Sequence, residues 1–124
     1  MKKLLSMLTV VIALLLTACW NPSVKEVAIT APWDKMNLPT KDNARVFSSD
    51  DKGLRVIHKG EPHEVAKMYI DALEKGGWEM TNHQSESWGY INDFRKDGQK
   101  IKVYTNEDYD SWIYDASKVN IVKN

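Results

Sequence analysis

Cys19 is the only cysteine in the 124 residues, and it ends the only long apolar run of the chain. Lys2 and Lys3 precede this run, which extends from residue 4 to residue 16. A basic start, a short apolar middle and small residues before the cut are typical of a secretory signal peptide. The run is shorter than the roughly 20 residues that span a bilayer. An exposed free thiol is unfavourable outside the cell, so we expect Cys19 to be modified.

The tetrad Leu16-Thr17-Ala18-Cys19 resembles the lipobox of bacterial lipoproteins. The resemblance covers residues 16–19 alone. It implies a diacylglyceryl thioether on Cys19, removal of residues 1–18, and an acyl chain such as palmitate on the new amino group. Two or more acyl chains anchor a protein stably, because each buried methylene contributes about 0.8 kcal/mol. The alternative is a cleaved secreted protein that keeps a free cysteine.

The residue after the cysteine indicates which membrane would hold the lipid anchor. An Asp at this position resembles an inner-membrane retention signal, whereas this chain has Trp20. The resemblance therefore implies the periplasmic face of the outer membrane if the host has two membranes.

The three histidines are the first candidates for metal chemistry. His58 and His63 come at the end of an expected strand and in the first turn of an expected helix, so they could be neighbours, while His83 stands apart. Zinc sites use three or four ligands, usually at closer spacing, and no further cysteine is present. We therefore expect no metal and no cofactor.

An acidic loop follows the last clear hairpin. Asn106, Asp108 and Asp110 alternate as at the start of a calcium loop, but Ser111 and Ser117 stand where such a loop needs Gly and Glu. Weak calcium binding and a solvated turn are the two interpretations of this loop.

Aromatic side chains gather on the same loop. Tyr109, Trp112 and Tyr114 stand beside Asn and Asp residues, and Tyr104 comes just before them. Tyr and Trp present an apolar ring with a polar tip, which suits binding surfaces. These residues form a candidate glycan- or peptidoglycan-binding platform, although a small domain also needs aromatic side chains for its core.

Catalysis has no support in the sequence. No Gly-x-Ser-x-Gly, His-Glu-x-x-His or glycine-rich phosphate loop is present. Without residues 1–18, the chain carries 15 Lys and Arg against 17 Asp and Glu, because Lys2 and Lys3 are lost from the original 17. This balance gives no basic footprint for nucleic acid. We therefore expect a non-enzyme that binds no nucleic acid.

One helix and several strands must position these residues. Pro62 suits the first helical position, an apolar stripe recurs through Val65, Tyr69 and Leu73, and Gly76-Gly77 ends the helix. Strands are expected over 54–58, before and after the Asp97-Gly98 turn, and around 119–121, with a weaker first strand at 45–47. Trp78 and Met80 lead into the sheet.

The hairpin can be aligned from the sequence. Placing Asp97-Gly98 at its tip pairs Phe94 with Ile101, Asn92 with Val103 and Tyr90 with Thr105 on one face. On the other face, Asp93 lies opposite Lys102. A shift of one residue would mix apolar and charged side chains on both faces.

These elements predict a two-layer α+β domain over 44–124, with one helix on a small antiparallel sheet in the order strand-helix-strand-strand-strand. Residues 19–43 contain three of the four prolines and are expected to be a tether after the lipidated cysteine, although Trp33 could pack on the domain. The architecture is similar to small helix-on-sheet domains of other bacterial envelope lipoproteins, a resemblance that carries no site residues.

The predicted function is therefore non-catalytic. We expect an envelope lipoprotein, anchored to the membrane through Cys19, that docks on another envelope protein as an accessory factor. Edge strands of the expected sheet could accept a strand of the partner. The alternative is a module that binds cell-wall glycan through the aromatic loop.

Overall fold

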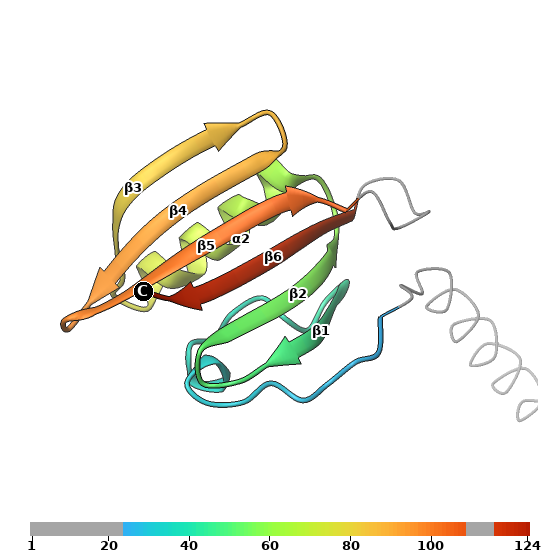
Figure 1. Cartoon of the computed structure of the whole chain (residues 1–124), viewed down its shortest axis with the longest axis horizontal. Helices are drawn as coiled ribbons and strands as arrows, with labels where there is room; N and C mark the ends of the chain where they lie inside the picture. Colours follow the sequence, from blue (N-terminus) through green and yellow to red (C-terminus); the bar gives the residue numbers. More distant parts are fainter. Residues whose placement is uncertain (1–23, 109–115) are drawn as a thin grey trace, which may run out of the picture.

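The computed structural model describes residues 24–108 and 116–124. They form a six-stranded sheet, one α-helix and a short 3-10 helix, in the order η1 (Trp33–Lys35), β1 (Ala44–Ser49), β2 (Gly53–Lys59), α2 (Pro62–Lys75), β3 (Glu79–Glu86), β4 (Gly89–Lys96), β5 (Gln99–Glu107) and β6 (Ala116–Lys123). Figure 1 shows α2 behind the sheet, against one of its faces. The predicted α+β class with an antiparallel sheet is confirmed.

The strands lie in the spatial order β1-β2-β6-β5-β4-β3, and every neighbouring pair is antiparallel. The predicted order of one strand, a helix and three strands is therefore incomplete, because it lacks the strands at both edges. Residues 45–47 do belong to the edge strand β1. The opposite edge strand, β3, has eight exposed and mostly polar residues, so it lacks the apolar alternation by which strands are recognised.

The central hairpin has the predicted alignment. Phe94 pairs with Ile101, Asn92 with Val103, and Asp93 with Lys102, whose Nζ lies 3.8 Å from an oxygen of the Asp93 carboxylate. Asp97 and Gly98 both have positive φ, as a type I′ turn requires. The turn residues and the facing apolar pairs thus select the same alignment.

The helix has the predicted bounds. It begins at Pro62, and its buried residues are Val65, Ala66, Tyr69 and Leu73. At its end, the backbone N–H of Gly76 donates to the carbonyl of Ala72 at 3.1 Å. This buried stripe packs against apolar residues of β2, β4, β5 and β6, which include Leu54, Phe94, Val103 and Ile121.

The predicted tether is corrected from residue 24 onward. The backbone N–H of Val27 donates to the carbonyl of Val46 at 2.9 Å, so this segment runs beside β1. Trp33 is 0 % exposed within the core, and its indole N–H donates to the carbonyl of Asp50 at 2.6 Å. Burial of a large aromatic side chain outweighs the flexible character of a proline-rich composition. Residues 24–43 are therefore part of the domain.

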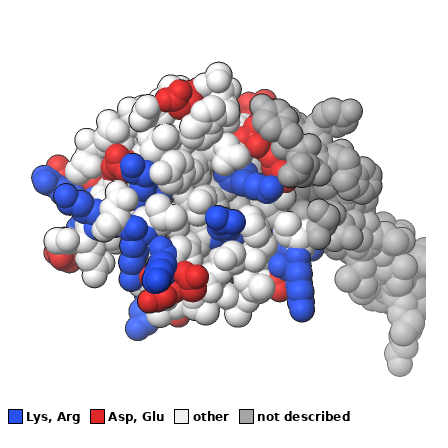
Figure 2. All heavy atoms as spheres, viewed as in Figure 1, with Lys and Arg blue, Asp and Glu red and all other residues white. Residues whose placement is uncertain are grey.

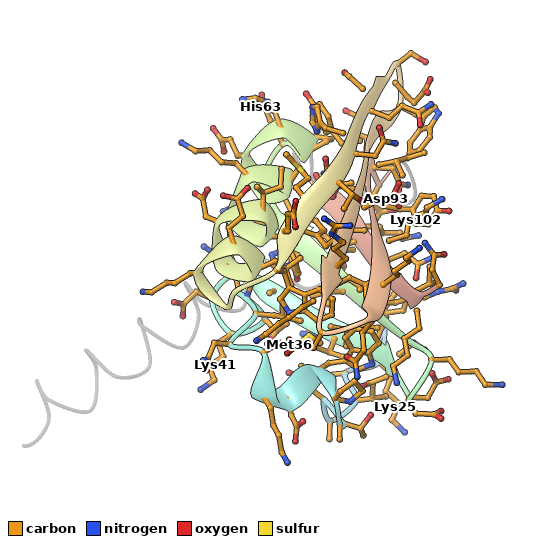
Figure 3. The ribbon with its side chains drawn as sticks, turned by 90° about the vertical axis from the view of Figure 1, so that its left-hand side faces the viewer. Lys25, Met36, Lys41, His63, Asp93 and Lys102 are labelled. Atoms are coloured by element: carbon orange, nitrogen blue, oxygen red, sulfur yellow. The ribbon has the colours of Figure 1, made fainter. Side chains whose placement is uncertain are left out.

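The sheet face away from α2 is polar. Figure 2 looks onto this face and shows Lys and Arg side chains spread over it, with acidic side chains between them. In the side view of Figure 3, Asp93 and Lys102 lie on the side of the sheet opposite the helix. One-sided packing of this kind explains why polar and apolar residues alternate along β4 and β5.

Candidate functional site

The outer edge of β3 is the most distinctive unpartnered feature of the described residues. All eight residues of β3 are exposed, and β3 pairs with β4 on its inner side only. Glu86 and Gly89 flank a two-residue turn and therefore form a hydrogen-bonded pair. Along an antiparallel ladder, hydrogen-bonded pairs alternate with pairs whose backbone groups point away from the neighbouring strand. Consequently, His83 and Ser85 direct their backbone N–H and C=O groups to the outer edge.

This edge has few of the features that usually block strand addition. The strand contains no proline and no Lys or Arg, and only one irregularity, between Met80 and Asn82, interrupts its pairing with β4. Proteins commonly protect edges with Pro, with Lys or with bulges. Residues 82–86 therefore offer a regular, accessible edge of five residues.

The other edge of the sheet is covered by the chain itself. Residues 24–30 lie beside β1, where Arg45 donates to the carbonyl of Val24 at 3.1 Å and the backbone N–H of Thr30 donates to the Ser49 hydroxyl at 2.9 Å. The two edges of the sheet therefore differ, and β3 is the edge open to a partner among the described strands.

A pocket of about 240 Å³ opens where the β3–β4 turn meets the start of α2. The described residues that line it include acidic and aromatic residues and no Lys or Arg: Glu61, Pro62, His63, Glu86, Ser87, Trp88, Gly89, Tyr90, Glu107 and Ala116. Trp88 is 38 % exposed. We call this feature the turn pocket.

Polar contacts connect the pocket to the helix face of the sheet. The Tyr90 hydroxyl lies 3.3 Å from Nδ1 of His63, and the Tyr90 ring stacks on His83 with centroids 5.9 Å apart. His83 in turn hydrogen-bonds the side chain of Asn92, which is buried. The side-chain nitrogen of Asn92 and the hydroxyl of Thr105 are buried without a partner. Polar side chains therefore extend from the pocket along the helix-facing side of β4 and β5.

The third histidine lies in the core, away from the turn pocket. His58 is 1 % exposed, and its Nε2 lies 2.6 Å from the Tyr69 hydroxyl. Burial lowers the pKa of His58 from 6.5 to about 4 and raises the pKa of Tyr69. Both groups are therefore neutral at pH 7, and the protonated hydroxyl can donate to the imidazole.

We expect His58 to make the fold sensitive to acid. Its pKa is lower in the folded than in the unfolded chain, so the unfolded chain binds the proton more tightly between pH 6.5 and pH 4. The free energy of unfolding should therefore fall as the pH drops through this range, by up to about 3 kcal/mol. Urea unfolding at several pH values measures this slope. His58→Gln should flatten the slope and the control His63→Gln should preserve it, and an unchanged slope in His58→Gln would contradict the assignment.

The histidines and the acidic loop do not combine into a metal centre in the described ranges. His58 bonds Tyr69 and His63 contacts Tyr90, and no group of three potential ligands occurs in residues 24–108 and 116–124. In the loop, the Asp108 carboxylate is mostly buried and lies 3.3 Å from Nζ of Lys118. Asp110 lies outside the described residues.

Other predicted site residues also lie outside the described ranges. These are the lipidation residue Cys19 and the glycan-platform residues Tyr109, Trp112 and Tyr114. Tyr104 is described and lies half-buried on β5. The lipid and glycan assignments remain sequence predictions.

Sequence reasoning missed both β3 and the turn pocket. Polar residues at 81–86 between a helix and a hairpin resemble a loop, and only the short Ser87-Trp88 connection to β4 hints at a second hairpin. The pocket joins residues 61–63 and 86–90 with Glu107 and Ala116, which are separate in the sequence, so sheet topology had to be known first.

No similarity guides the interpretation of this site. Neither a family model, nor a curated protein, nor a solved structure matches the chain. In addition, none of the helices in the described part of the chain is long and apolar enough to cross a membrane.

Proposed function

We propose that this chain is a lipid-anchored bacterial envelope lipoprotein that acts without catalysis, as an accessory domain that docks on another envelope protein. The observation that carries the docking role is the accessible outer edge of β3, with its outward backbone groups at His83 and Ser85. Strand addition to such an edge is a recurrent way to bind an extended segment of a partner.

The arrangement of the sheet supports this role. The chain enters the domain beside β1, and β3 lies five strand spacings away, at about 24 Å. Figure 3 shows His63, which lines the turn pocket, near the opposite end of the molecule from Lys25. A lipid on Cys19 would hold the β1 side near the bilayer, because residues 19–23 span at most about 17 Å. The free edge then faces away from the membrane.

We expect Cys19→Ser to release the protein from the membrane. The substitution removes the acceptor of the thioether, and with it the acyl chains that would hold the domain on the bilayer. Fractionation of cells, together with labelling by a palmitate analogue, measures the effect. The wild-type chain should be labelled and found with membranes. A label that persists in Cys19→Ser, or an unlabelled wild-type chain, would disprove the anchor.

The glycan-binding alternative remains a prediction from Tyr109, Trp112 and Tyr114. All three residues lie outside the described ranges. Trp112→Ala tests this alternative, because loss of retention on cell-wall polymer by a folded variant would favour a platform.

A further inference from the structure

From the position of the turn pocket, we infer that the partner segment is an extended strand that carries a Lys or Arg side chain, and that this side chain enters the pocket when the strand pairs with β3. This inference rests on the proposed docking role and specifies the chemistry of the partner.

The backbone contribution comes from β3. The outward N–H and C=O groups of His83 and Ser85 can pair with an added strand without any change in the bonds to β4. Met80, near the start of β3, is 36 % exposed, and Trp88, in the turn that follows β3, is 38 % exposed. An extended segment along this edge would cover both apolar side chains, which contributes favourable burial at each end of the contact.

The charge contribution comes from the pocket at the Glu86 end of the strand. Glu61, Glu86 and Glu107 line it, and none of the three takes part in an ion pair of the described residues. The carboxylate of Glu86 already accepts a hydrogen bond from Nε2 of Gln84 at 2.7 Å, so the charge contribution comes mainly from Glu61 and Glu107. The indole of Trp88 and the ring of Tyr90 supply aromatic surface in the same cavity. Carboxylates beside aromatic faces favour a cationic side chain, by Coulomb attraction and by cation–π contact.

A second copy of the chain fits this edge less well. Continuous antiparallel pairing of two β3 strands would put the two β1 edges about 53 Å apart, facing in opposite directions. Two chains anchored in one membrane through short segments beside β1 would then have to lie flat on it. Moreover, β3 carries two Glu and no Lys or Arg, so the paired strand of a second copy would bring no Lys or Arg to the pocket.

The test is to select peptides from a random heptapeptide phage library on the full-length protein in detergent micelles. We expect Lys or Arg to be enriched at one end of the selected peptides, with β-branched residues elsewhere. Two variants then separate the contributions. Ser85→Pro removes an outward N–H and is compared with Ser85→Ala, which keeps it. Glu61→Gln/Glu107→Gln removes pocket charge and is compared with Glu26→Gln/Glu74→Gln, which alters exposed glutamates that do not line the pocket.

For a selected peptide, Kd should rise more than tenfold in Ser85→Pro and about three- to tenfold in the pocket variant, while both controls match the wild type. Selected peptides without Lys or Arg that still require the Ser85 N–H would overturn this inference and leave the docking edge in place. Basic peptides that bind Ser85→Pro as well as Ser85→Ala would overturn both. A dimer in light scattering that Ser85→Pro dissociates would assign the edge to a second copy and also overturn the inference.

Discussion

Trp33→Ala should lower the free energy of unfolding by about 4 kcal/mol, as is typical for a large aromatic side chain removed from a core. Trp33 is 0 % exposed, packs in the main core cluster and donates its indole N–H to Asp50. The substitution leaves a cavity and also an unpaired carbonyl. Because small domains have a total stability of about 5–15 kcal/mol, much of the variant should unfold on mild heating.

Trp88→Ala is the matched control, because Trp88 is the same residue type and is 38 % exposed in the β3–β4 turn. We expect its free energy of unfolding to change by less than about 1 kcal/mol. Urea unfolding followed by far-UV circular dichroism compares the two without relying on tryptophan fluorescence. Equal stabilities of the two variants would show that residues 24–43 are a tether after all.

Gly89→Ala should be the second most destabilising substitution, and it should lower the free energy of unfolding by about 3 kcal/mol. A Cβ at this position would lie 1.9 Å from the carbonyl oxygen of Thr105 and 2.9 Å from Cα of Asn106, and both of these atoms are backbone. Gly89 also has a φ of 155°, which side chains rarely tolerate. Relief of the clash would require β4 and β5 to separate at the pocket end.

Gly98→Ala serves as the control for backbone conformation. Gly98 also has a positive φ, 78°, but nothing lies within 4 Å of a Cβ built there. Gly98→Ala should lower the free energy of unfolding by about 1–2 kcal/mol, because only the left-handed backbone conformation disfavours a side chain there. Thermal unfolding of both variants measures the difference, and a Gly98→Ala variant less stable than Gly89→Ala would contradict the close approach of β4 and β5.

The predictable parts of the fold were those in which local signals agree with tertiary packing. The helix combines Pro62 at its start, an apolar stripe and Gly76-Gly77 at its end, and its bounds are as predicted. In the β4–β5 hairpin, the Asp97-Gly98 turn and the pairing of Asp93 with Lys102 specify one alignment. Such agreement between levels makes an element recognisable from the sequence.

The missed parts were those that only tertiary context defines. β3 lies at the edge of the sheet, where all eight of its residues are exposed and mostly polar, so no hydrophobic period marks it. Trp33 follows a stretch that resembles a linker, and its place in the core depends on contact with the distant Asp50. The turn pocket is likewise formed by segments that are far apart in the sequence.

Photo-crosslinking in intact cells tests the central claim most directly, namely that a partner docks at the free edge of β3. A photoreactive amino acid replaces Gln84, an exposed residue of β3, and in a second strain it replaces Lys41, which is exposed beside the covered β1 side. The account predicts one discrete adduct with another envelope protein from position 84, its loss when Ser85→Pro is added, and no such adduct from position 41. An adduct from position 41 with none from position 84 would contradict it.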